Sequence, residues 1–326
     1  MADLPARFAV ANPKYAAIDR ATTAPDLKSL AFVPDLIVIT APAPAIPQII
    51  ADAGKCGVAG AVIISSGLGH GPGSIAEAVE KAARAYKMRI VGPNCLGVMF
   101  PDVALNASFA ARHPRSGSLA LISQSGAIAA AMVDWGAERS VGFSGIVSIG
   151  DQLDVDVADL LDYFAVDQRT SAILLYIEAV TDARKFMSAA RAAARLKPVV
   201  VVKSGRMAQG AKAAATHTGA LAGSDAVYDA AMRRAGLLRV LDLRELFDCA
   251  ELLGRHTHAP EGNKLAILTN GGGLGILAVD RLTELGGTAS VLSPEVVAKL
   301  NTVLPPTWSN PAAHASLSPS PRMRRS

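Results

Sequence analysis

The sequence predicts an α/β protein, built from parallel β-sheets with helices on their faces. Short runs rich in Val, Ile and Leu alternate along the chain with longer segments of helical periodicity, which is the pattern of parallel strands joined by crossover helices. Of the 326 residues, 51% are hydrophobic, 18% are charged and 5% are aromatic, as in sheets buried under alanine-rich helices. This length suffices for two or three domains with buried cores.

Composition argues against several classes of protein. No apolar run approaches the roughly 18 residues that a membrane-spanning helix needs, and the N-terminus lacks the basic and apolar regions of a signal peptide. The three cysteines, Cys56, Cys95 and Cys249, do not have the spacing of metal ligands. This sparse and odd number favours a reducing compartment. We therefore predict a cytoplasmic protein without a membrane segment.

The charge distribution argues against nucleic acid as a partner. The formal net charge is only +4, and Arg322, Arg324 and Arg325 lie together at the C-terminus. Elsewhere the two signs are mixed, and no basic stripe alternates with aromatic residues. A small, nucleotide-like ligand remains open.

Residues 1–113 are predicted to form a first α/β domain. We expect its strands at 8–10, 36–39, 61–64 and 89–91, with helices over 46–53 and 75–86. Ligands of parallel sheets bind at the carboxyl ends of the strands, where Ser65, Pro93 and Asn94 are expected to lie. They are therefore candidates for binding a substrate, although each segment alone is better explained as an ordinary turn.

Residues 114–254 are predicted to form a second α/β domain. The strand expected at 119–122 is followed by Ser125 and Gly126 at the start of a helix of small residues. Because a helix N-terminus attracts anions, these two residues are candidate phosphate ligands. Glu178 directly follows another apolar strand. It fits equally well a catalytic carboxylate or a solvated residue that caps the next helix.

His217 lies among small residues, between a strand-like run and an amphipathic helix. Small neighbours let an anion approach the imidazole closely, and the hydroxyls of Thr216 and Thr218 can donate hydrogen bonds to phosphate oxygens. A lone histidine of this kind is more often a surface residue at a helix start. The segment by itself therefore favours the simpler interpretation.

Two clusters of polar residues have some features of metal sites. Asp151, Asp154 and Asp156 are spaced like part of a calcium loop, but the glycine and the distal glutamate of such a loop are missing. We interpret them as loop and helix-start residues. His256 and His258 have no third ligand nearby, so a linker is the better interpretation. We predict no metal site.

A polar linker over 255–262 is predicted to lead into a shorter third unit over 263–311. A strand there enters a glycine run with Gly272 and Gly273 at the start of a helix, which makes a second candidate anion site. Two strands and two helices cannot close a doubly wound sheet, so we expect this unit to be incomplete. Residues 312–326 are rich in Ser, Pro and Arg and are predicted to be disordered.

Taken together, these motifs resemble those of the NDP-forming acyl-CoA synthetases. The chain is most similar to the ADP-forming acetyl-CoA synthetases and more distantly similar to succinyl-CoA synthetase, over nearly its whole length up to about Pro311. The most specific parts are the histidine segment and the Gly-Pro-Asn-Cys motif. The matching segments are Asn12-Pro13-Lys14-Tyr15, Val91-Gly92-Pro93-Asn94-Cys95-Leu96-Gly97, Leu105-Asn106-Ala107-Ser108-Phe109, Ser123-Gln124-Ser125-Gly126-Ala127, Leu175-Tyr176-Ile177-Glu178, Lys203-Ser204-Gly205-Arg206, Thr216-His217-Thr218-Gly219-Ala220-Leu221-Ala222-Gly223, Thr269-Asn270-Gly271-Gly272-Gly273 and Asn310-Pro311.

The resemblance implies a fold and a reaction. The fold is a Rossmann-like CoA-binding domain over 1–113, a flavodoxin-like domain over 114–254 and a partial second flavodoxin-like domain over 263–311. In the reaction, an acyl-CoA and phosphate give an acyl phosphate and free CoA. The phosphoryl group then moves to a histidine and on to ADP or GDP.

The resemblance also assigns roles to residues. His217 matches the phosphorylated histidine, and Glu178 matches the glutamate that orients it. A carboxylate that accepts a hydrogen bond from one ring nitrogen leaves the other free to attack. The helix starts at Ser125 and Gly126 and at Gly272 and Gly273 would neutralise the phosphate. Asn94, after Pro93, would lie close to the thioester or the phosphate.

The chain departs from the family pattern at both ends. The opening strand and the Gly-rich CoA turn of the family are missing, and so is an ATP-grasp domain, so we expect a chain shortened at both ends. ADP or ATP and Mg²⁺ would then be bound only by a separate ATP-grasp subunit in an oligomer or by a missing domain, with coenzyme A as substrate of this chain. A non-catalytic CoA-binding regulatory module of an acetyltransferase-type protein and an inactive fragment remain alternatives. The presence of His217 and Glu178 favours the enzyme.

Overall fold

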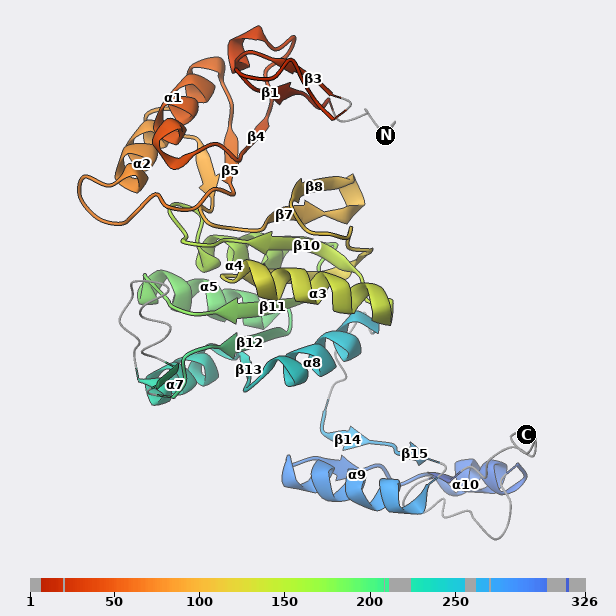
Figure 1. Cartoon of the computed structure of the whole chain (residues 1–326). Coiled ribbons are helices and arrows are strands. Elements are labelled where there is room, and N and C mark those ends of the chain that lie inside the picture. The colour runs from red at the N-terminus through yellow and green to blue at the C-terminus, as the bar shows by residue number, and fades with distance from the viewer. Residues whose placement is uncertain are drawn as a thin grey trace. The chain divides into compact units, whose positions relative to one another are not determined.

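The computed structural model describes residues 7–19, 21–207, 209–210, 224–255, 262–269, 271–303 and 315–316. The chain divides into two compact units, Met1–Ala259 and Pro260–Ser326. Each unit is built from α-helices and β-strands (Figure 1). Within the described ranges, no helix is both long enough and apolar enough to cross a membrane.

The N-terminal part of the first unit contains two three-stranded sheets. Strands of the first sheet have the order β1-β3-β2, and those of the second have the parallel order β4-β5-β6. The helices α1 and α2 pack against the second sheet, with Ile46, Ile50 and Val79 fully buried. The elements are β1 (Val10–Ala11), β2 (Ala17–Ile18), β3 (Ala21–Ala24), η1 (Leu27–Ser29), β4 (Leu36–Ile39), η2 (Ala43–Ala45), α1 (Ile46–Cys56), β5 (Gly60–Ile63), α2 (Ile75–Ala85) and β6 (Arg89–Val91).

The centre of the first unit is a seven-stranded sheet with the order β13-β12-β11-β9-β10-β7-β8. The five strands from β13 to β10 are parallel, and β7 and β8 extend the sheet in antiparallel fashion. The elements are β7 (Gly97–Phe100), η3 (Pro101–Val103), β8 (Leu105–Ser108), β9 (Ser116–Ser123), α3 (Gly126–Arg139), β10 (Phe143–Ser148), α4 (Val157–Val166), β11 (Ala172–Ile177), α5 (Ala183–Leu196), β12 (Val199–Lys203), α7 (Asp225–Ala235), β13 (Leu238–Val240) and α8 (Leu243–Arg255).

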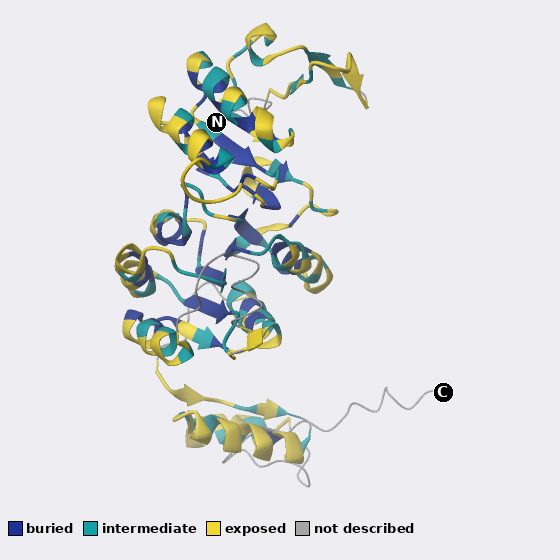
Figure 2. Ribbon diagram, turned by 60° about the vertical axis from the view of Figure 1, so that its left-hand side comes forward, coloured by how far each residue is buried: buried dark blue, intermediate teal, exposed yellow. Residues whose placement is uncertain are grey.

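Alternation along the central strands explains the two layers of helices. In β9, Ala120 and Ile122 belong to one buried cluster with α4, α5 and α7, whereas Leu119 and Leu121 belong to another with α3 and α8. Successive side chains of a strand point to opposite faces, so a continuously apolar strand needs helices on both sides. Figure 2 shows the consequence, with buried strands between helices that expose only their outer surfaces. The predicted α/β class with parallel sheets is confirmed.

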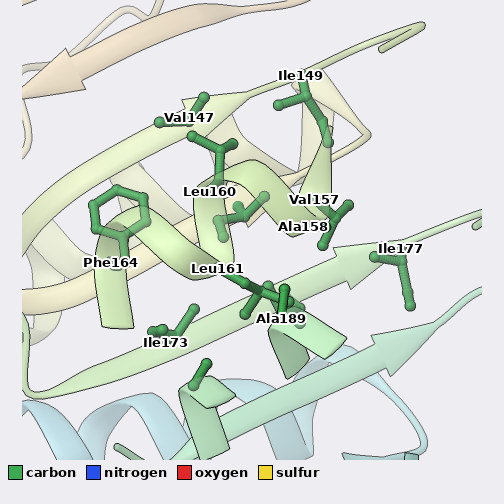
Figure 3. Packing of buried hydrophobic residues seen from close by; sticks show 14 of the residues in the cluster. Val147, Ile149, Val157, Ala158, Leu160, Leu161, Phe164, Ile173, Ile177 and Ala189 are labelled. Carbon is green, nitrogen blue, oxygen red and sulfur yellow. The ribbon is translucent and has the colours of Figure 1, made fainter. Parts of the chain in front are cut away.

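The core beneath α4 is a cluster of buried apolar side chains that includes Phe164, Leu161 and Val147 (Figure 3). Phe164 is fully buried, and its ring stacks on that of Phe100 with 6.2 Å between centroids. Gly145 in β10 faces both rings, and a Cβ there would lie 2.8 Å from Phe100 and 2.9 Å from Phe164. The glycine therefore provides the space that the two rings fill.

β7 and β8 precede residue 113, yet both belong to the seven-stranded sheet. The domain boundary expected after residue 113 stays a prediction. In β7, Val98 pairs with Val147 and Met99 pairs with Ile146 at the edge of the seven-stranded sheet. Both β7 side chains are buried, each in a different cluster of that sheet. A central sheet leaves a free edge beyond β10, and the hairpin after the Gly-Pro-Asn-Cys motif covers it.

The second unit contains short strands and two helices. Among its described residues no side chain belongs to a buried hydrophobic cluster, and Leu274, Ile276 and Leu277 of α9 are 65%, 60% and 65% exposed. That the unit is incomplete and that 255–262 is a linker remain expectations. The elements are β14 (Lys264–Leu265), β15 (Leu268–Thr269), α9 (Gly272–Glu284), β16 (Thr288–Ala289), α10 (Pro294–Asn301) and β17 (Ala315–Ser316).

Replacing Phe164 with alanine is expected to destabilise the first unit by about 3–5 kcal/mol, because the substitution leaves a cavity between β10 and α4. Val166 on the same helix is 73% exposed, so Val166→Ala serves as the control and should change the free energy of unfolding by less than about 0.5 kcal/mol. Urea-induced unfolding followed by circular dichroism measures both values. Equal losses in the two variants would contradict the packing described here.

Candidate functional site

The carboxyl ends of β5 and β6 bring together the polar residues expected at the edge of the first domain. Ser65 donates a hydrogen bond through Oγ to the carbonyl oxygen of Ala41 at 2.6 Å. The backbone N–H of Asn94 donates to the carbonyl oxygen of Ser65 at 3.0 Å. Ser65, Pro93 and Asn94 therefore lie at one edge, as the sequence predicts. Their roles as ligands remain a hypothesis.

This edge is joined to the loop that follows β10. The backbone N–H of Asp151 donates to the carbonyl oxygen of Pro93 at 3.0 Å, and Asn94 Nδ2 donates to Asp151 Oδ1 at 3.1 Å. Gly150, directly before Asp151, has φ +52°, and a Cβ there would overlap with the Pro93 carbonyl oxygen. The carboxyl ends of the two parallel sheets thus meet at the Gly-Pro-Asn-Cys motif.

Ser125 caps the helix that begins at this edge. Its side chain accepts a hydrogen bond from the backbone N–H of Ile128 at 3.4 Å, and α3 begins at Gly126. The Cα of Gly126 faces Leu96, since a Cβ there would lie 3.4 Å from that residue. The predicted helix start is confirmed, and its partial positive charge lies beside the Gly-Pro-Asn-Cys-Leu segment. Gly272 and Gly273 likewise form the first turn of α9 in the second unit.

Glu178 is half-buried directly after β11, where a glutamine side chain holds its backbone. Gln124 Oε1 accepts hydrogen bonds from the backbone N–H groups of Glu178 and of Ala179, the latter at 2.9 Å. Gln124 Nε2 donates to the carbonyl oxygen of Ala179 at 2.7 Å. The next helix, α5, is capped by Asp182. Glu178 is therefore not its cap, and that alternative is wrong.

Sequence reasoning missed the role of Gln124. The residue is part of the Ser-Gln-Ser-Gly motif, in which the serine and the glycine are the usual residues of a helix start. The sequence signal is an amide side chain just beyond the apolar run 119–122, because an amide there can pair with backbone groups at strand ends. Lys203, at the end of β12, is likewise predicted only as part of a family motif.

Cys95 in the Gly-Pro-Asn-Cys motif is not suited to act as a nucleophile. It is 3% exposed and donates through Sγ to the carbonyl oxygen of Ile63 at 3.3 Å. Burial raises the pKa of the Cys95 thiol to about 12, so the thiolate that would react is absent at neutral pH. The cysteine fills the space between the motif and β5.

The aspartates that follow β10 have structural roles, as the sequence predicts. Asp154 accepts hydrogen bonds from Arg89 Nε at 2.9 Å and from the backbone N–H of Ile90 at 2.8 Å. Asp156 caps α4 in a reciprocal capping box with Asp159. Throughout the part of the chain that the structure describes, no group of three or more His, Cys, Asp and Glu side chains is arranged to hold a metal ion.

His217 lies outside the described residues, which resume at Ser224 after Gly210. The described structure near this gap consists of the end of β12 and the start of α7. Asp225, at that start, forms an ion pair with Arg239 of β13. Arg239 is also 3.3 Å from Asp229, so the first turns of α7 are fixed to the sheet.

Comparison with known proteins identifies the family. Residues 6–101 match the model of a CoA binding domain, and residues 116–253 match that of a succinyl-CoA ligase like flavodoxin domain. The chain is 44% identical over 265 residues to subunit alpha of the ADP-forming acetate–CoA ligase I of Pyrococcus furiosus, covering 79% of this chain and 57% of that subunit. The chain belongs to the family of NDP-forming acyl-CoA synthetases, which includes this ADP-forming acetate–CoA ligase.

Further relatives agree with this assignment. The ADP-forming acetate–CoA ligase I of Archaeoglobus fulgidus is 41% identical over 297 residues, which are 90% of this chain and 43% of that protein. The structure of the dinucleotide forming acetyl-coenzyme A synthetase 1 of Ca. Korarchaeum cryptofilum, in complex with phosphate and ADP, has a TM-score of 0.86 and 34% identity, and the match covers 94% of this chain and 67% of that one. The resemblance and the predicted CoA-binding and flavodoxin-like folds are confirmed.

Gln124→Ala is expected to loosen the segment that carries Glu178 in this family member. It removes the partner of two part-buried backbone N–H groups and of one carbonyl, and a fully buried group left in this way costs about 1–3 kcal/mol. Hydrogen exchange of the Glu178 and Ala179 amides should become faster while the global fold persists. Gln48, exposed on α1 and bonded only to Asp52, provides the control Gln48→Ala. Unchanged exchange at Glu178 in Gln124→Ala would show that the Gln124 hydrogen bonds do not hold this segment.

Alkylation is expected to distinguish the buried thiol from the more accessible one. With iodoacetamide at pH 8, Cys56 should react in the native protein, whereas Cys95 should react only after unfolding, because its raised pKa and burial suppress the thiolate. Peptide mass spectrometry before and after urea measures both. Native modification of Cys95 at the rate of Cys56 would show that the motif is open to solvent.

Proposed function

We propose that this chain is the CoA-binding and histidine-bearing part of an ADP-forming acyl-CoA synthetase. The observation that carries the proposal is one sheet edge. There Glu178, held by Gln124, directly follows β11, and β11 pairs with β9, the strand that leads into α3. This edge combines a half-buried carboxylate with a helix N-terminus that attracts phosphate. The chain spans little more than half of the Pyrococcus furiosus subunit, 57% of its length, so the complete activity belongs to the proposal.

The first proposed step forms an acyl phosphate. A phosphate oxygen attacks the thioester carbonyl of an acyl-CoA, the new C–O bond forms, the C–S bond breaks and CoA leaves as the thiol. The helix N-terminus at Ser125 and Gly126 stabilises the phosphate. Asn94, with Pro93 and Ser65, lies at the adjoining edge and contacts the thioester or the phosphate in this proposal.

The second proposed step transfers the phosphoryl group to His217. A ring nitrogen attacks phosphorus, the N–P bond forms and the acid leaves as carboxylate. Neutral imidazole is a competent nucleophile near neutral pH. Glu178 accepts a hydrogen bond from the other ring nitrogen and stabilises the charged phosphohistidine. The helix start at Gly272 and Gly273 is proposed to supply a second set of N–H donors.

The third proposed step needs a partner. The phosphoryl group passes from His217 to ADP, so that acyl-CoA, phosphate and ADP give acid, CoA and ATP. The Pyrococcus relative is named a subunit alpha, which supports a second subunit. We infer an ATP-grasp subunit that binds ADP or ATP with Mg²⁺, in an oligomer. The sparse and odd number of cysteines supports the reducing cytoplasm as the proposed location.

The phosphohistidine is tested by labelling. The protein is mixed with acetyl-CoA, the acyl-CoA of the acid named for its relatives, and ³²P-phosphate. We expect label that is stable in base and lost in acid. His217→Ala should abolish it, because His217 is the proposed acceptor of the phosphoryl group. His113, which lies 3.3 Å from Asn106, provides the control His113→Ala, which should label like the wild type.

The outcomes separate the proposal from its alternatives. Label that survives His217→Ala would overturn the assignment of the histidine. Binding of CoA without label in the wild type would favour the non-catalytic CoA-binding module. Absence of both binding and label would favour the inactive fragment. Transfer of the label to ADP on addition of an ATP-grasp subunit would extend the proposal to the whole reaction.

A further inference from the structure

Lys203 is a buried cation at the carboxyl end of β12. Only 3% of its surface is exposed, and its register partner in β11 is Ile177, the residue before Glu178. Its Nζ lies 4.6 Å from the centroid of the Tyr228 ring on α7, and it donates to the carbonyl oxygen of Ser204. Removing an ammonium group from water costs free energy, so neighbouring groups must compensate for its burial.

The charges that act on Lys203 come from three neighbouring elements. They are Glu178 beyond β11, Asp225 at the start of α7 and Arg239 in β13. Arg239 already forms ion pairs with Asp225 and Asp229. Lys203, in contrast, is within ion-pair distance of no carboxylate in the described part of the chain. No single carboxylate in the described part of the chain therefore neutralises the charge of Lys203 at the sheet edge.

We propose that Lys203 is a positioning residue that holds the Glu178 carboxylate by charge and offsets the negative charge of the phosphoryl group at this edge; this inference rests on the function proposed above. Glu178 and Asp225 both carry negative charge near the end of β12. An incoming phosphoryl group adds more, so the site needs a compensating cation. Lysine suits this role because its ammonium is a compact point charge that can balance several anions at once.

The protonation of Lys203 gives the proposal a pH signature. Burial lowers the pKa of Lys203, the charges of Asp225 and Glu178 act to raise it, and Arg239 acts to lower it. The ammonium is present below this lowered pKa and is lost as the pH rises through it. Histidine phosphorylation should therefore fail on the alkaline side at a pH below the ordinary lysine value of about 10.5.

A second lysine at the other end of the same strand provides a matched control. Lys197 precedes β12 and donates to the carbonyl oxygen of Phe164 at 2.7 Å. Burial also lowers the pKa of Lys197, and the charge of Asp167 acts to raise it. It lies at the amino edge of the sheet, away from Glu178. Lys197→Met therefore removes a comparable cation without touching the carboxyl edge.

The test compares ³²P incorporation from acetyl-CoA and phosphate across pH 6–10. Lys203→Met should lower the initial labelling rate at least tenfold, and Lys203→Arg should restore it to within about threefold of wild type and remove the alkaline decline, because arginine stays protonated. Lys197→Met should keep both the rate and the pH profile of the wild type. Wild-type labelling in Lys203→Met, or an alkaline decline that persists in Lys203→Arg, would overturn the proposal.

A direct titration makes the result independent of catalysis. Lysine ¹³Cε chemical shifts, assigned to Lys203 with Lys203→Arg, report its pKa in the full chain. Glu178→Gln should lower this pKa, since it removes a negative charge that favours the ammonium. An unchanged pKa would overturn the coupling even if Lys203→Met fails to fold. If the wild type takes no label while Glu178→Gln shifts Lys203, the phosphohistidine function fails and the charge coupling stands.

Discussion

The structure of the first unit depends on one constraint, which is the pairing of backbone groups where parallel strands end. The central strands are buried on both faces, and the N–H and C=O groups just beyond their last residues are only partly open to water, so they need other partners. Side chains do so instead. Gln124 pairs with both N–H groups and one carbonyl of Glu178 and Ala179, and Ser65 pairs with Ala41. The same polar residues that complete the sheet thus fix the geometry of the candidate site.

The meeting of two sheet edges explains why small and polar residues are concentrated there. Pro93 and Asn94 follow β6, and Gly150 and Asp151 follow β10, and the two loops share hydrogen bonds through backbone and side chains. A side chain at Gly150 would overlap with Pro93. Cys95, buried with a raised pKa, fills space rather than reacting. The Gly-Pro-Asn-Cys motif therefore allows the two loops to pack closely. The same contacts hold Asn94 in place for any ligand that binds there.

The sequence allowed the fold class and the helix start at Ser125 to be predicted, because both follow from local patterns of apolar and capping residues. It did not indicate that β7 and β8 complete the central sheet, since strand pairing across β10 is a non-local property. It also did not indicate the hydrogen bonds from Gln124 to the Glu178 segment or the burial of Lys203. An amide and a lysine are ordinary surface residues by type, and only the packing of α7 and β11 around them makes them buried. Glu178 fits two interpretations by sequence for the same reason, and the cap at Asp182 excludes a capping role of Glu178 on α5.

Two different forces act on the segment that carries Glu178. Hydrogen bonds from Gln124 fix its backbone, and the charge of Lys203 acts on its side chain. Hydrogen bonds are short-ranged and directional, whereas the field of a buried ammonium extends over several ångströms and is weakly screened. The backbone can therefore stay fixed while the charge balance of the edge changes. In the proposed reaction, a phosphoryl group at the N-terminus of α3 would alter the potential at Glu178 without moving β11, as is required of a site that holds phosphate at one stage and releases it at the next.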